Sequence, residues 1–183
     1  MNKNLLFALL FFTTFISCDE RKTVESLTPI VAPTTKTKTE LISRKWGISE
    51  SYFDVDAKKT IVYGVGAVSN PNLTTDITPD DYITFTKDGK IESYSGLDKK
   101  TLKGTWKFLN NETQIQFPLD GAEFVMDIIS LTEKDAEIAQ KIVIANLANE
   151  TQTSQGIIFI VGLGGLTTKD SKVVKLGLKL KAK

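Results

Sequence analysis

The chain of 183 residues contains no histidine and a single cysteine, Cys18. The absence of histidine removes the usual general base of serine and cysteine hydrolases and the commonest zinc ligand. One cysteine cannot form a disulfide within the chain. Basic and acidic residues number 23 and 22, so no positive field for nucleic acid is expected. We therefore expect no enzyme activity, cofactor, metal or nucleic-acid partner, although an acid pair that acts on carbohydrates stays open.

Residues 1–17 have the pattern of a bacterial signal peptide that ends directly before Cys18. Lys3 supplies the positive start, residues 5–16 form an apolar run, and Ser17 is the small residue before the cysteine. The run is too short to span a bilayer as a helix. The segment resembles a lipobox, which implies that acyl chains on Cys18 hold the protein on a membrane, at about 0.8 kcal/mol per buried methylene. An ordinary secretory signal with a chance cysteine is the alternative.

The composition of residues 18–38 predicts a flexible tether between the membrane and the folded domain. The stretch is rich in threonine and has few large apolar side chains, so it buries too little surface to offset its conformational entropy. Asp19 and Glu20 are similar to the acidic sorting signals of some Gram-negative lipoproteins, although an ordinary solvated charge run explains them equally well. We expect a lipid-anchored protein of the bacterial cell envelope, at the outer membrane, on its periplasmic or its surface side. The sequence does not indicate an oligomeric state.

From residue 39 onward, short alternating segments between turn residues predict one all-β domain over residues 39–183. Thr39 is expected to cap a short helical turn at Leu41 and Ile42, before the first strand. The regular spacing indicates an antiparallel meander. The predicted strands are residues 46–53, 60–67, 81–86, 90–95, 102–109, 113–117, 122–131, 137–144, 156–162 and 172–181.

Two hairpins have a register that their apolar residues determine. A three-residue loop with Gly89 in the left-handed region puts Phe85 opposite Ile91, whereas a two-residue Asp88-Gly89 loop would put Phe85 opposite Glu92. We prefer the first register because it keeps both apolar side chains on the buried face. In the next hairpin, a loop of two or four residues keeps four apolar side chains on one face, namely Trp106, Phe108, Ile115 and Phe117.

Residues 132–145 fit either a strand or a helix. Thr132 is a plausible helix cap, and Ile138 and Ile142 are four residues apart, as on one face of a helix. As a strand, residues 137–144 would instead place Ile138, Gln140 and Ile142 on one face.

The motifs between residues 39 and 145 resemble the lipocalin-like domain of small bacterial lipoproteins. They are LISRKW at 41–46, DDYITFTKDGK at 80–90, GTW at 104–106 and DIISLTEKDAEI at 127–138. The resemblance implies an antiparallel barrel or half-barrel, here of about eight to ten strands, and places residues 137–144 on a strand. Arg44 departs from it, because the family usually has a glycine there that allows close packing at the barrel floor. Residues 146–183 have no counterpart, so barrel closure by the last two predicted strands rests on their alternation.

A lipocalin-like barrel can be filled by side chains or can hold one small ligand. We expect a small apolar or amphipathic ligand, and the candidate cavity residues are Trp46, Glu50, Tyr63, Phe85, Trp106 and Phe117. Glu50 is expected on the same face of the first strand as Trp46 and Ile48, where it would be a polar anchor for the ligand. A bulge near Tyr52 would instead turn it to solvent. The alternative is an interaction module of the cell envelope with a filled core and no small-molecule ligand.

Three further patterns have simpler explanations than a site. Residues 161–166 are rich in glycine but fit no phosphate-binding motif, so we expect a turn. Asp76, Asp80 and Asp81 could chelate calcium, but they lack the EF-hand spacing and suit ordinary turn chemistry. Residues 174–183 alternate leucine and lysine, and we expect the lysines to solvate the outer face of a strand rather than to bind anionic headgroups.

Overall fold

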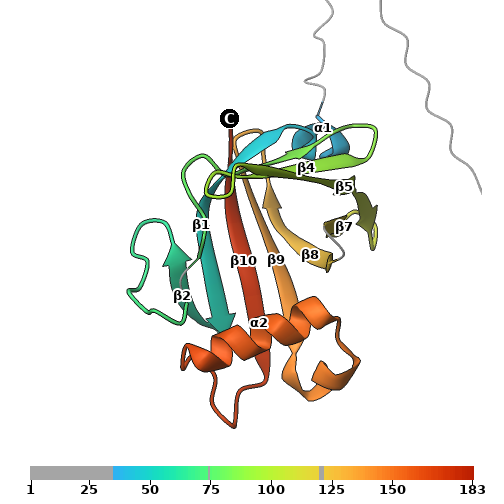
Figure 1. Ribbon diagram of the computed structural model, residues 1–183. Coiled ribbons are helices and arrows are strands. Elements are labelled where there is room, and N and C mark those ends of the chain that lie inside the picture. The colour runs from blue at the N-terminus through green and yellow to red at the C-terminus, as the bar shows by residue number, and fades with distance from the viewer. Residues whose placement is uncertain (1–34, 74, 120–121) are drawn as a thin grey trace, which may run out of the picture. The chain divides into compact units, whose positions relative to one another are not determined.

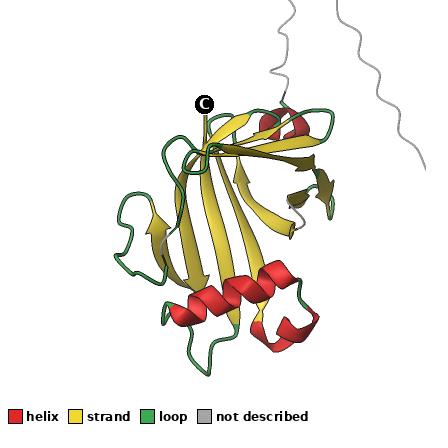
Figure 2. Ribbon diagram, viewed as in Figure 1, coloured by secondary structure: helices red, strands yellow, loops and turns green. Residues whose placement is uncertain are grey.

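The computed structural model describes residues 35–73, 75–119 and 122–183, and residues 35–183 form one compact unit. Figures 1 and 2 show mostly strands with few helices. The elements are α1 (Lys38–Ile42), β1 (Lys45–Val55), β2 (Lys58–Tyr63), β3 (Tyr82–Phe85), β4 (Lys90–Ser95), β5 (Lys100–Thr105), β6 (Lys107–Leu109), β7 (Gln114–Leu119), β8 (Ala122–Leu131), β9 (Asp135–Val143), the 3-10 helix η1 (Ile144–Asn149), α2 (Gln152–Leu163) and β10 (Val173–Ala182).

One antiparallel sheet curls into a half-barrel (Figure 1). Its hydrogen-bonded order is β5-β4-β3-β1-β10-β9-β8-β7-β6, and β2 pairs with the second half of β1. Only Trp106 separates β5 from β6 in the chain, so one bent segment supplies both ends of this order. β10 pairs with β9 and with β1, which joins the last strand to the first. The predicted all-β antiparallel meander is confirmed.

Both predicted hairpin registers are confirmed. Phe85 pairs with Ile91, and Gly89 has a φ of 78°. Phe108 pairs with Ile115 across the turn between β6 and β7. The strand alternative for the ambiguous segment is also correct, because β9 covers Asp135–Val143 and pairs on both sides.

The predicted strand at 156–162 is wrong, because these residues belong to α2. Thr151 caps the helix by accepting a hydrogen bond from the Ser154 N–H. Ile157 and Val161, four residues apart, are the apolar residues that α2 buries, which is helical spacing. β10 already pairs on both edges, so the last strand offers no free edge to a further one. α2 instead crosses the end of the half-barrel (Figure 2), and β10 closes the meander alone.

Three smaller predictions also need correction. The second strand ends before Gly64 rather than at residue 67, because Gly64 has a φ of +106° that breaks the extended chain. The strand predicted at 102–109 is interrupted at Trp106. Thr37, not Thr39, caps α1, in a capping box that it shares with Glu40.

Two clusters of buried side chains fill the unit. The tryptophan core consists of Ile42, Trp46, Ile83, Phe85, Ile91, Trp106, Ile115, Phe117, Met126, Ala136, Ile138 and Leu180. The helix-side core, which includes residues of α2, consists of Phe53, Val55, Val62, Leu73, Ile142, Ile157, Val161 and Val174. β1, β9 and β10 contribute to both cores.

Arg44 lies against the tryptophan core, where the resemblance expects a glycine. Its guanidinium carbon lies 5.5 Å from the centroid of the Trp46 ring. Its terminal nitrogens donate to the backbone oxygens of Glu133, at 2.5 Å, and Glu40, at 3.3 Å. A long cationic side chain, rather than close backbone packing, therefore covers Trp46.

Candidate functional site

Four of the six candidate cavity residues pack together in the tryptophan core. The ring of Phe85 makes edge contacts with Trp106 and Phe117, at centroid distances of 5.7 and 6.0 Å. Trp46 is fully buried, and both indole N–H groups donate to backbone oxygens, at 2.8 and 3.0 Å. Interlocked rings with satisfied polar groups are typical of a structural core. This end of the half-barrel is therefore filled by its own side chains.

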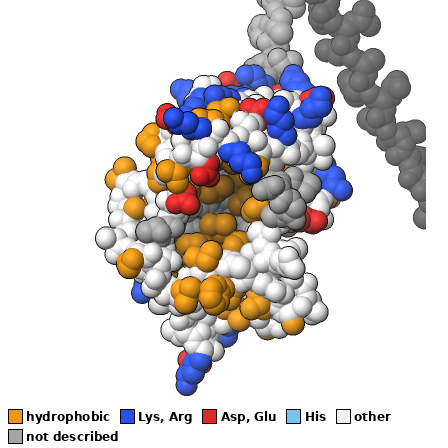
Figure 3. Space-filling view, in the orientation of Figure 1, with side chains coloured by type: hydrophobic (Ala, Val, Ile, Leu, Met, Phe, Trp, Pro, Cys, Tyr) orange, Lys and Arg blue, Asp and Glu red, His pale blue; other side chains and the backbone are white. Residues whose placement is uncertain are grey.

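An apolar hollow lies between the two cores. Figure 3 shows it as a depression floored by hydrophobic side chains, between the part of the sheet near α1 and helix α2. On β10, Leu180 and Val174 are buried in one core each, whereas Leu176 and Leu178 between them are only partly buried. These two leucines share the inward face of β10 with Leu180. Apolar surface thus remains accessible where the two cores meet.

Glu50 lies on the outer face of the sheet, because a β-bulge changes its parity. The register of β1 against β10 shifts between Ile48 and Glu50, so that Glu50 pairs with Lys179. Its carboxylate lies 2.5 Å from Lys59 Nζ and 3.1 Å from Lys179 Nζ. Burial disfavours the ionised carboxyl, but the hydrogen bonds from the two lysines outweigh it and lower the pKa of Glu50. The bulge precedes Tyr52, and Glu50 does not face the hollow.

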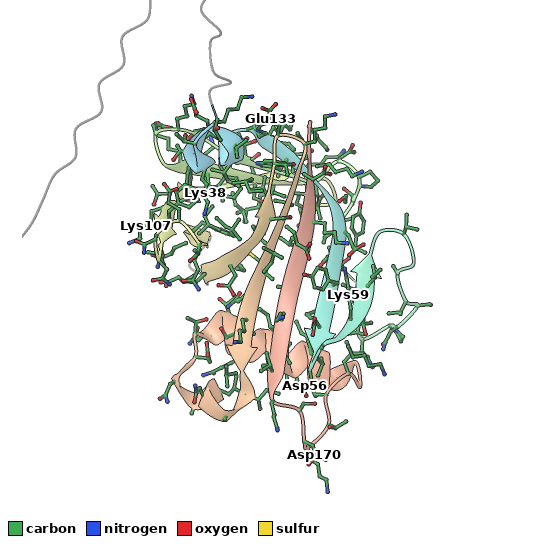
Figure 4. All side chains as sticks on the ribbon, turned by 180° about the vertical axis from the view of Figure 1, so that it is seen from behind. Lys38, Asp56, Lys59, Lys107, Glu133 and Asp170 are labelled. Atoms are coloured by element: carbon green, nitrogen blue, oxygen red, sulfur yellow. The ribbon has the colours of Figure 1, made fainter. Side chains whose placement is uncertain are left out.

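Tyr52 lies across Gly177 on the same outer face. A Cβ atom on Gly177 would lie 2.1 Å from Tyr52 Cζ, so the ring occupies the space that a side chain would need. The Tyr52 hydroxyl donates to Glu137 Oε1 at 2.6 Å, and Lys59 Nζ lies 3.9 Å from the ring centroid. Burial, followed by the bond to Glu137, raises the pKa of Tyr52 well above its ordinary value. Figure 4 shows this outer side, with Lys59 labelled.

Tyr63 borders a separate, shallow pocket of about 620 Å³. Uncharged residues of the segment 62–75 line it. Within this segment, the side chains of Asn70 and Asn72 donate to the backbone oxygens of Gly164 and Leu163, at 3.0 and 3.1 Å. The segment is thereby tied to the end of α2, and Tyr63 does not belong to the tryptophan core that holds four of the candidate cavity residues.

A polar cleft of about 310 Å³ lies where β8 separates from β9. The two strands pair as far as Asp127 and Ala139, after which β8 pairs only with β7 and β9 only with β10. The residues that line the cleft come from β7, β8, β9 and the start of α2, and they are Gln114, Glu123, Val125, Asp127, Gln140, Lys141, Glu150, Thr151 and Ser154. Polar side chains therefore line the place where the sheet opens.

Gln140 is a buried polar residue in the wall of this cleft, with 5% of its surface exposed. Its Nε2 donates to Ser154 Oγ at 2.9 Å, whereas its Oε1 has no hydrogen-bond partner among the described residues. Sequence reasoning put Gln140 on the face of Ile138 and Ile142 but did not select it as a site residue. An amide between two isoleucines on a buried face is the signal that could have identified it.

Helix α2 exposes apolar side chains on its outer side. Phe159, Ile160 and Leu163 are 66%, 45% and 56% exposed, and the segment 151–168 contains no charged residue. Among the described residues, no helix is long and apolar enough to cross a membrane. One face of α2 therefore packs on the helix-side core, and the opposite face is uncharged and exposed to solvent.

The aspartates before β3 support a turn. Asp81, which is 8% exposed, accepts hydrogen bonds from the Thr78 hydroxyl at 2.6 Å and from the Gly96 N–H at 2.8 Å. Within the described ranges, no group of three acidic, cysteine or histidine side chains is arranged to hold a metal ion. The glycine-rich end of α2 is also a turn, in which Gly165 has a φ of 72°.

Cys18, the predicted leader at 1–17 and most of the predicted tether lie outside the described residues. Lipidation of Cys18 therefore stays a prediction. The chain matches no known family model and no curated protein. The resemblance to lipocalin-like domains accordingly rests on the sequence motifs alone.

Proposed function

We propose that this protein is a lipid-anchored, non-enzymatic protein of the bacterial outer membrane whose half-barrel binds a small apolar or amphipathic molecule. The apolar hollow carries this proposal, because Leu176 and Leu178 leave inward-facing apolar surface only partly covered. Ligand pockets are typically concave and mostly apolar, with a few polar groups that orient the ligand. The hollow, with the polar cleft near it, has this composition.

The ligand's apolar chain would lie over the two leucines, between the tryptophan core and α2. Each methylene that leaves water contributes about 0.8 kcal/mol, so a chain of about eight methylenes gains roughly 6 kcal/mol before the entropic cost of binding. The filled tryptophan core limits how deep such a chain can reach. We therefore expect a single short or medium-length chain to bind.

Native mass spectrometry of the chain from residue 19 onward tests ligand binding. We expect a co-purified molecule that organic solvent releases, and we expect Leu178→Glu to abolish it, because a carboxylate would then face the hollow. Leu97→Glu is the matched control, since Leu97 is 57% exposed. Protein that carries no ligand and binds no added apolar fluorophore would refute the proposal.

The lipid anchor is tested separately by Cys18→Ser in the full chain. Cys18 is the only cysteine, so no other residue can form the thioether that acylation requires. We expect the variant to accumulate as uncleaved precursor or as soluble protein. If the variant is cleaved and still fractionates with membranes, the anchor proposal is wrong, and another surface holds the protein there.

A second candidate function is an interaction module of the cell envelope with no small-molecule ligand. The filled tryptophan core favours it, because the buried side chains of that end of the half-barrel pack against one another. Under this alternative, Leu178→Glu would lower the free energy of unfolding but would not change the binding of the protein to its partners in the cell envelope.

A further inference from the structure

We infer that the cleft between β8 and β9 binds the polar head of the ligand, and that this head is uncharged and carries hydroxyl groups. The inference rests on the proposed function and adds the chemical class of the ligand. It starts from the buried amide of Gln140, whose Oε1 has no hydrogen-bond partner among the described residues.

Gln140 is the residue that links the cleft to the hollow. Gln140 of β9, which lines the cleft, pairs directly with Leu176 of β10, which is partly buried at the hollow. Side chains on directly opposite residues of antiparallel strands are neighbours, with Cβ atoms about 4.5–5.5 Å apart. A ligand whose chain covers Leu176 can therefore reach Gln140 with its head group. The head group would extend through the gap between β8 and β9 toward Asp127 and Lys141 on the outer side of the sheet.

The amide of Gln140 selects a group that can both donate and accept hydrogen bonds. With Nε2 bonded to Ser154 Oγ, the amide presents a carbonyl oxygen that needs a donor. In the opposite orientation, the Ser154 hydroxyl would donate to Oε1, and the amide would present an NH₂ group that needs an acceptor. A hydroxyl satisfies either orientation. Leaving a buried polar atom without a partner is costly, so this bond contributes strongly to binding.

The charges of the cleft exclude an anionic head. Three carboxylates, Glu123, Asp127 and Glu150, line it together with one ammonium group, that of Lys141. Gln114 Nε2 donates to Asp127 Oδ1 at 2.7 Å, which fixes this carboxylate at the cleft. A carboxylate or phosphate head would be repelled by the like charges, whereas hydroxyl groups can donate to them. Lys141, which follows Gln140 on β9 and faces the outer side of the sheet, opposes a cationic head.

Displacement of the neutral fluorophore phenylnaphthylamine compares two ligands with the same chain. Monododecanoylglycerol and dodecanoate are titrated at neutral pH into the chain from residue 19 onward. We expect the glyceride to bind about tenfold more tightly, since one well-placed hydrogen bond is worth about that factor. Gln140→Met should reduce this ratio to about twofold, because it removes the amide and keeps the volume. Gln152→Met, on the exposed start of α2, should leave the ratio unchanged.

A charge variant keeps the inference testable if Gln140→Met does not fold. Glu150→Gln should lower the ratio of the affinity for the glyceride to that for dodecanoate, because the loss of a negative charge strengthens the binding of dodecanoate. Equal or tighter binding of dodecanoate by the unmodified chain would overturn the inference but leave the proposed function standing. A ratio that neither variant changes would also overturn it. If neither ligand displaces the fluorophore, the proposed function itself fails.

Discussion

The tryptophan core and the helix-side core differ in how the chain assembles them. Much of the tryptophan core comes from successive hairpins, such as Phe85 with Ile91, and ring contacts then join these hairpins to one another. The helix-side core joins Val55 of β1 to Ile157 of α2 and Val174 of β10, which are distant in sequence. The first core is closed by interlocking rings, whereas the second depends on a helix docked on the sheet. The hollow lies between them, where neither packing is complete.

The comparison predicts that the tryptophan core is the more sensitive to loss of a side chain. Phe85→Ala should destabilise the protein by about 3–5 kcal/mol, because Phe85 is 1% exposed and its loss leaves a large cavity. Denaturant unfolding followed by tryptophan fluorescence measures this, since both tryptophans lie in this core. Val65→Ala, at a 94% exposed position, is the control that should change little. A small loss for Phe85→Ala would mean that this end is loosely packed.

Two isoleucines of α2, Ile157 inside the helix-side core and Ile160 outside it, form a matched pair. Ile157→Ala should cost about 2–4 kcal/mol, and Ile160→Ala less than about 0.5 kcal/mol, because they are 8% and 45% exposed. The stability of Phe159→Ala distinguishes a helix from a strand over residues 156–162. In a strand, residue 159 would share the buried face of 157 and 161, whereas in α2 it is 66% exposed. A cost above 2 kcal/mol for Phe159→Ala would contradict the helix.

Replacing either of two glycines by alanine should change the free energy of unfolding, and the two changes should have opposite signs. Gly156→Ala should stabilise the protein by about 0.5–1 kcal/mol, because Gly156 is helical and a Cβ there meets nothing within 4 Å. Gly177→Ala should destabilise it, because the new Cβ collides with the Tyr52 ring. Stabilisation by Gly177→Ala would show that Tyr52 lies elsewhere.

The smallest effect is expected from the ion pairs on the outer face. The pKa of Glu50 is lower in the folded protein, so its contribution is present above the ordinary value of 4.5 and is lost as the pH falls through the folded value. Glu50→Gln should remove about 0.5–1 kcal/mol at neutral pH and weaken the acid dependence of unfolding. Asp170→Asn, in an exposed loop, is the control. An unchanged acid dependence in Glu50→Gln would show that the pair does not stabilise the fold.

The alternation of apolar and polar residues predicted most of the sheet. Together with the turn residues, this period-two pattern determines both where the strands lie and the register in which they pair. It failed at 156–162, since a run of apolar residues fits a buried strand or a helix, and only the occupied edges of β10 exclude the strand. For a related reason, the sequence left open whether Glu50 faces the interior or, through a bulge, the solvent. The bulge after Ile48 changes parity, and no residue type in that stretch marks its position. The cleft at Gln140 depends on where β8 leaves β9, which is a property of the curved sheet.

Methyl NMR of leucine-labelled protein, titrated with monododecanoylglycerol, tests most directly that the junction of the two cores is the binding site. We predict that the methyl signals of Leu176 and Leu178 shift in a saturable way, while those of the fully buried Leu180 change little. Leu163, on the exposed side of α2, reports non-specific association. Shifts at Leu163 without shifts at Leu176 and Leu178 would contradict the account.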